Sequence, residues 1–253
     1  MYTTIKLILY YFGYQLGFSA IAMFVSKLVP MDMVTMTSLA MVASTLIMSW
    51  HLLRYGYVDL IHDRYKTLTP VIMGISVVFV FAAMYVLNLL IEQIGIPNTM
   101  EETFLAMSRN PFGILSITLL APVLEELLFR GAIQKGLLLR YKPWTAILTS
   151  SLLFGVVHLN PAQIPFAFIL GLMFGWLYYR TGSLLPGIVG HVLNNTVATV
   201  NMYLYGTTTI EEQMQNSTVM WLWGLAALAA LVTTALWLDR KLKDQPSKCN
   251  DKN

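Results

Sequence analysis

The chain of 253 residues is 57% hydrophobic and only 11% charged, and its mean hydropathy is +0.63. Soluble globular domains carry about 25% charged residues, so this composition excludes an ordinary soluble fold and indicates a protein with several membrane spans. The formal net charge of +3 is small and scattered along the chain, so we expect no nucleic-acid partner.

The apolar segments predict an all-α, polytopic membrane helix bundle. A helix needs about 20 apolar residues to cross a bilayer. Eight segments reach or approach this length, at about 5–29, 33–53, 68–91, 112–129, 144–159, 162–179, 184–204 and 218–238. The fourth segment can continue past Arg130 as far as Arg140. We therefore expect about eight transmembrane helices.

The distribution of positive charge predicts the orientation of this bundle. With both termini in the cytoplasm, only Lys27 and Arg109 of the 16 Lys and Arg residues fall in the exterior loops. We divide the chain into an N-terminal part (1–111, about three spans and an interfacial segment), a core (112–204), and a last span with a basic cytoplasmic tail (205–253). The segment 100–111 is either a short interfacial helix or a connecting loop with one helical turn.

Two adjacent carboxylates interrupt the fourth apolar segment. Glu125 and Glu126 lie inside "LLAPVLEELLFRGAIQ", and one carboxylate in the hydrocarbon region costs at least about 2.5 kcal/mol, which favours a functional role. Glu126 and Arg130 are four residues apart on one helix face, where they can form an ion pair. Glu125 then remains available for a different role. The alternative is that both acids only stabilise the packing of a neighbouring helix.

Two later segments carry histidines with polar or aromatic neighbours. "FGVVH" places Phe154 four residues before His158, and "HVLNN" places His191 before Asn194 and Asn195. Each motif alone is compatible with ordinary helix packing, since asparagine often links helices within a membrane. Counted from the turn at 141–143, Glu125 and His158 lie at a similar depth. His158 can therefore meet the glutamates, whereas His191 lies shallower by the same count unless its helix starts within the bundle.

These residue types suit the activation of a water molecule. A carboxylate such as Glu125 can act as general base, and a histidine can share or shuttle the proton. A second histidine with an asparagine amide can stabilise an oxyanion. The rival chemistry is a zinc ion held by Glu125, His158 and His191, although no H-E-x-x-H motif is present. The chain contains no G-x-S-x-G motif, so the sequence does not indicate a serine hydrolase.

The three motifs, in this order, resemble those of the CPBP family, the CAAX-protease and bacteriocin-processing group also called Abi, which includes the Ras-converting CAAX endopeptidases. The resemblance covers about 112–204. It implies that Glu125 activates water with help from His158, and that Glu126 pairs with Arg130 or assists. It also implies that His191 and Asn195 form an oxyanion hole or hold the water, and that Phe154 lines the pocket. Family members are described both as metalloproteases and as metal-free glutamate proteases, so zinc is a possible cofactor.

The expected function is that of an intramembrane endopeptidase, a hydrolase in contact with membrane lipids. Its substrates would be peptides or lipid-anchored proteins, and its location would be a bacterial cytoplasmic (inner) membrane. One alternative is a non-proteolytic membrane scaffold or regulator, which would tolerate loss of Glu125 or His158. Another is a proton-coupled transporter that uses Glu125 and Glu126 as a relay, although the sequence shows no repeat of the transporter kind.

Overall fold

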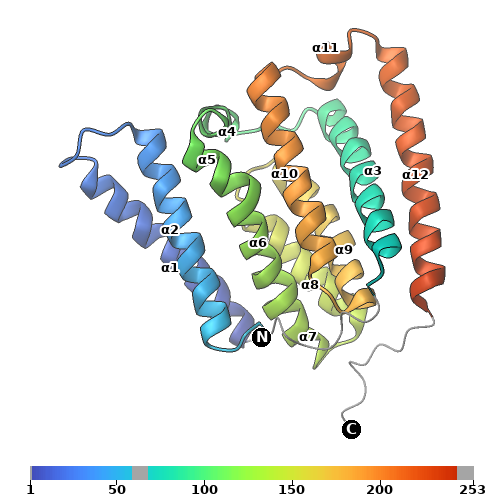
Figure 1. The fold of residues 1–253 in the computed structure, drawn as a ribbon, viewed down its shortest axis with the longest axis horizontal. Coiled ribbons are helices and arrows are strands. Elements are labelled where there is room, and N and C mark those ends of the chain that lie inside the picture. Colours follow the sequence, from blue (N-terminus) through green and yellow to red (C-terminus); the bar gives the residue numbers. More distant parts are fainter. Residues whose placement is uncertain (1, 59–67, 244–253) are drawn as a thin grey trace.

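The computed structural model describes residues 2–58 and 68–243, and every regular element within these ranges is a helix (Figure 1). This confirms the predicted all-α bundle. The predicted cytoplasmic tail beyond residue 243 lies outside the described residues. The separate helices are α1 (Tyr2–Val25), α2 (Met33–Arg54), α3 (Pro70–Ile94), α4 (Glu101–Ser108), α8 (Pro143–Val156), α9 (Gln163–Thr181), α10 (Leu185–Tyr205), α11 (Ile210–Met214) and α12 (Ser217–Lys243).

One further helix runs without a break from residue 111 to residue 138. It consists of α5 (Pro111–Leu115), the π-helical segment η2 (Ser116–Leu120), α6 (Ala121–Glu126), the π-helical segment η3 (Leu127–Gln134) and α7 (Lys135–Leu138). The predicted continuation of the fourth apolar segment past Arg130 is therefore confirmed, and it ends close to the expected residue. The helix α4 shows that the segment after residue 100 is helical rather than a plain loop.

Fewer helices meet the requirements for a membrane span than the eight we predicted. In the described part of the chain, five helices are long and apolar enough: α1, α2, α3, the composite helix 111–138, and α12. The helices α8, α9 and α10 form at the predicted places. However, α8 has only 14 residues, and α9 and α10 fall short by composition rather than by length. The count of eight spans stays a prediction.

Local chemistry explains where the helices begin and end. Asp32 and Thr69 cap α2 and α3 by accepting hydrogen bonds from backbone N–H groups three residues later. Asn110 caps α5 in the same way, directly before Pro111 at the first helical position. Gly182 ends α9 with a φ of 67°, a left-handed conformation that glycine adopts without strain.

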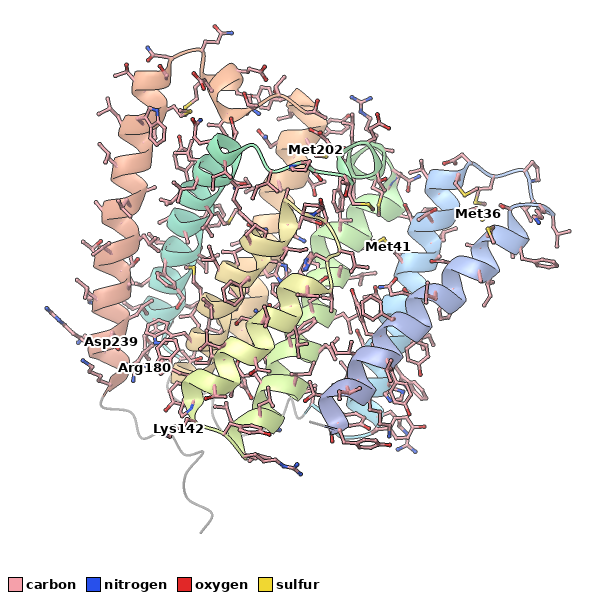
Figure 2. All side chains as sticks on the ribbon, turned by 180° about the vertical axis from the view of Figure 1, so that it is seen from behind. Met36, Met41, Lys142, Arg180, Met202 and Asp239 are labelled. Atoms are coloured by element: carbon pink, nitrogen blue, oxygen red, sulfur yellow. The ribbon has the colours of Figure 1, made fainter. Side chains whose placement is uncertain are left out.

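The helices form a central group with a flanking element on each side. α1 and α2 pack as a hairpin at one edge, and α12 packs against α3 at the other (Figure 1). α8 and α9 pair in the centre, and α10 contacts α3, η2, α6 and α9. α1 begins and α12 ends at the same end of the bundle, where Figure 2 also places Lys142, Arg180 and Asp239. The cytoplasmic location of both termini stays a prediction.

Candidate active site

The two glutamates lie where the composite helix changes its pitch. Glu125 and Glu126 end α6, between the π-helical segments η2 and η3. π-helical turns are rare and occur frequently at functional sites, because the wider turn changes the direction of the side chains that follow it. The unusual backbone geometry therefore flanks the residues that the sequence identified as candidates.

Glu126 forms the predicted ion pair with Arg130, which is thereby confirmed. Arg130 Nη1 donates to Glu126 Oε1 over 2.8 Å, and both side chains are only 1% exposed. Arg130 Nη2 also donates to the backbone oxygen of Gly171 in α9, over 3.2 Å. The guanidinium lies 4.3 Å from the ring centre of Phe154 and 5.4 Å from that of Phe174, within the range of cation–π attraction. Arg130 therefore connects the glutamate helix to α8 and α9.

His191 lies between the two carboxylates. Its Nδ1 is 3.1 Å from Glu126 Oε1, and its Nε2 is 3.6 Å from Glu125 Oε2. Phe174 stacks on the imidazole with ring centres 5.3 Å apart, and the His191 side chain is only 5% exposed. A neutral imidazole that donates from Nδ1 to Glu126 directs its lone pair at Glu125. Nε2 of His191 therefore faces Glu125 while Nδ1 is engaged with Glu126.

The side chain of Glu125 is more exposed than that of Glu126. Its side chain is 12% exposed, whereas that of Glu126 is 1% exposed. The charge of Glu125 also acts on the phenol of Tyr11, so α1 approaches the site from the side of the hairpin. Glu125 is thus the carboxylate that a water molecule can reach.

His158 is anchored to its own helix. Its Nδ1 lies 2.7 Å from the backbone oxygen of Phe154, and because a carbonyl only accepts, Nδ1 must carry the proton. Nε2 of a neutral His158 is then an acceptor. The Phe154 ring meets both His158 and His191 edge-on, at 5.0 and 5.7 Å between ring centres. Phe154 therefore brings the two histidines to one place. In the described part of the chain, His158 contacts Phe154 rather than the glutamates.

Asn195 is held by two hydrogen bonds of its side-chain amide. Its Nδ2 donates to the backbone oxygen of Ile117 in η2 over 2.9 Å, and its Oδ1 accepts from Asn194 Nδ2 over 2.8 Å. An amide nitrogen has two N–H bonds, so one remains for another acceptor. The structure thus attaches Asn195 to the glutamate helix, while its proposed contact with an oxyanion stays a prediction.

The predicted zinc ligands do not form a ligand set in this arrangement. Within the described residues, no three or more His, Cys, Asp or Glu side chains are grouped so that they could hold a metal ion. His191 directs both ring nitrogens to carboxylates, and His158 uses Nδ1 on its own helix. The geometry therefore does not fit a metal held by Glu125, His158 and His191.

The sequence reasoning missed three residues that shape the site: Phe174, Gln134 and Gly187. Gln134 continues the four-residue series of Glu126 and Arg130, and its Nε2 donates to the backbone oxygen of Gly175 over 2.8 Å. A Cβ atom at Gly187 would lie 2.7 Å from Glu126 Oε2, so only glycine fits there without displacement. Gly187 precedes His191 by four residues, and this spacing is the feature of the sequence that could have identified Gly187 as part of the site.

Comparisons with known proteins bear on the central part of the chain. Residues 108–197 match the family described as type II CAAX prenyl endopeptidase, Rce1-like. This central segment is similar to the CAAX-protease family. It contains all three motifs, from Glu125 to Asn195, and overlaps the predicted core 112–204. With its several apolar helices, the chain is an integral, multi-pass membrane protein.

The chain also resembles a protein of Bacillus subtilis (strain 168) named "Putative membrane peptidase YdiL". The two are 31% identical over 90 residues, which is 36% of this chain. The match spans 37% of the length of that relative. No solved structure matches the chain.

Proposed function

We propose that this chain is an intramembrane endopeptidase that hydrolyses peptide bonds of small peptides or lipid-anchored proteins in a bacterial cytoplasmic membrane. The observation that carries the proposal is the contact of one imidazole, that of His191, with both Glu125 and Glu126. Buried acid and base groups in direct contact are typical of catalytic sites. The family match of residues 108–197 and the name of the Bacillus relative support the same class of reaction.

Glu125 is the general base in this proposal. Glu126 already accepts from Arg130 and contacts His191, and it is almost fully buried. Glu125 is more exposed, and within the described residues it pairs with His191 alone. A positioned general base contributes roughly 10²–10⁴-fold to the rate of such a reaction. Glu126 then has the different task of fixing the imidazole of His191.

The reaction follows from these roles. Glu125 takes a proton from a water molecule while the water oxygen attacks the scissile carbonyl carbon and the C=O electrons move to the carbonyl oxygen. The free N–H of Asn195 donates to this oxyanion, while His191 stays between Glu126 and Glu125. Glu125 then returns the proton to the amide nitrogen as the C–N bond breaks, giving a carboxyl group and an amine. His158 accepts from the attacking water through Nε2.

The mechanism that we propose depends on glutamate and needs no metal. It rests on the contacts that the three predicted zinc ligands make: His191 lies against two carboxylates and His158 binds the backbone oxygen of Phe154. An asparagine amide such as that of Asn195 also suits an oxyanion better than a zinc ion.

Quantitative analysis of new peptide termini in membranes tests the function without a known substrate. Membranes from cells with the wild-type protein are compared with membranes from cells with Glu125→Gln at equal expression. Termini that appear with the wild type and vanish with Glu125→Gln support the proposal. The matched control is Glu102→Gln, at an exposed glutamate in α4, which must leave the same termini in place. Termini that persist with Glu125→Gln contradict proteolysis by this site and leave the scaffold or transporter alternatives.

A further inference from the structure

The glutamate helix contains a buried proline three residues before Glu125. This residue, Pro122, lies at the start of α6, directly after the π-helical segment η2. In η2 the hydrogen bonds run to the fifth preceding residue, as the bond from Ala121 N–H to the oxygen of Ser116 shows. The next bond in this register would run from residue 122 to the oxygen of Ile117. Proline has no N–H, so this bond cannot form.

The oxygen of Ile117 obtains its hydrogen bond from another helix instead. Asn195 Nδ2 in α10 donates to it over 2.9 Å. Ile117 is 9% exposed, and a buried carbonyl that lacks its helical donor requires another one. The second atom of the Asn195 amide, Oδ1, accepts from Asn194. The orientation of the amide is therefore fixed at both its oxygen and its nitrogen.

We propose that Pro122 is a positioning residue of the active site. By offering no N–H at the fifth position after Ile117, Pro122 leaves the oxygen of Ile117 free to bind Asn195. That bond uses one N–H of the Asn195 amide and orients the second one. The structural link between Pro122 and Asn195 holds for any activity of the chain, whereas its effect on catalysis rests on the proposed function.

A double-mutant cycle on thermal unfolding tests the structural link without an activity assay. Asn195→Leu leaves the oxygen of Ile117 unpaired, so we expect the unfolding temperature to fall by a few degrees. Pro122→Ala restores an N–H at position 122, which can bind Ile117 directly. In the Pro122→Ala background, Asn195→Leu must lower the unfolding temperature by less than half of its effect in the wild-type protein. Equal decreases in the two backgrounds would overturn the proposal.

Cleavage kinetics on a substrate found by the terminus analysis test the catalytic consequence. We expect Pro122→Ala to lower kcat with KM unchanged, by up to the roughly 10²–10³-fold that loss of one oxyanion donor causes. Its unfolding temperature should stay the same or rise, since alanine favours a helix. In the Asn195→Leu background Pro122→Ala must have no further effect on kcat.

The matched control is Pro111→Ala, in the same helix. Pro111 occupies the first helical position, where an N–H has no partner within the helix, so kcat must not change. A wild-type kcat in Pro122→Ala would overturn the positioning role. If the wild type cleaves no substrate, the proposed function fails, and the unfolding cycle still decides whether Pro122 directs Asn195 to Ile117.

Discussion

Nδ1 of His191 lies 3.1 Å from Oε1 of Glu126, the same oxygen that Arg130 binds over 2.8 Å. One carboxylate thus fixes both a guanidinium and an imidazole, and the other nitrogen of that imidazole faces Glu125. The two adjacent glutamates therefore differ in their surroundings. Glu126 organises the site, and Glu125 is the carboxylate that can act on a water molecule.

Loss of Arg130 should strongly destabilise the protein. Arg130→Met leaves Glu126 buried without its cationic partner, and breaking a buried ion pair in this way typically costs about 3–5 kcal/mol. Thermal unfolding of the purified protein in detergent measures the effect. Lys243→Met is the control, because Lys243 is 64% exposed and its pair with Asp239 contributes at most about 1 kcal/mol. Similar losses for both variants would contradict the central role of Arg130.

A methyl group at position 187 should disturb the contact between Glu126 and His191. The Cβ atom of Gly187→Ala would lie 2.7 Å from Glu126 Oε2, so the carboxylate has to move. We expect a large loss of proteolysis together with a lower unfolding temperature. Gly136→Ala is the matched control, since a Cβ atom there meets nothing within 4 Å and alanine favours a helix. Wild-type activity of Gly187→Ala would show that the position of Glu126 is not critical.

Asn160 should be essential for the turn that follows His158. Its side chain is fully buried: Oδ1 accepts from Thr99 N over 3.2 Å, and Nδ2 donates to Asn98 Oδ1 over 2.8 Å. Asn160→Ala removes these bonds, so we expect a loss of about 1–3 kcal/mol in unfolding experiments. Asn98→Ala, at an exposed position, removes only one partner of this amide and should cost less. A larger loss of stability for Asn98→Ala than for Asn160→Ala would contradict the role of Asn160 in this turn.

Removal of metal ions should leave proteolysis intact. The three predicted zinc ligands are engaged with other groups, and the proposed base needs no metal. After treatment with a strong chelator, the wild-type protein should retain its cleavage rate, and elemental analysis of active protein should show far less than one zinc per chain. Loss of activity on chelation, restored by added zinc, would contradict the glutamate mechanism.

The sequence predicted those features of the site that depend on short spacing. The ion pair of Glu126 and Arg130 follows from a separation of four residues on a helix. The contact of Glu126 with His191 could not be predicted in this way, because 65 residues separate them and their distance depends on how α10 packs against α6. Periodicity also gave no sign of the π-helical turns around Pro122, since the apolar pattern is continuous there.

The fold was predictable to a similar degree. The apolar segments identified the places of the long helices, because each must bury or shield its backbone polar groups in a membrane. Hydropathy did not establish how many of them span the bilayer. α8 is short, and α9 and α10 combine apolar residues with groups such as Arg180 and His191. These three helices surround the site, where packing against neighbours replaces contact with lipid.

The most direct test of the central claim is the cleavage rate of Glu125→Gln, measured on the reconstituted protein with a substrate found by the terminus analysis. Glutamine keeps the size of the side chain and cannot accept a proton from water. We predict a loss of roughly 10²–10⁴-fold in kcat with an unchanged unfolding temperature. A cleavage rate equal to that of the wild type would contradict Glu125 as the base.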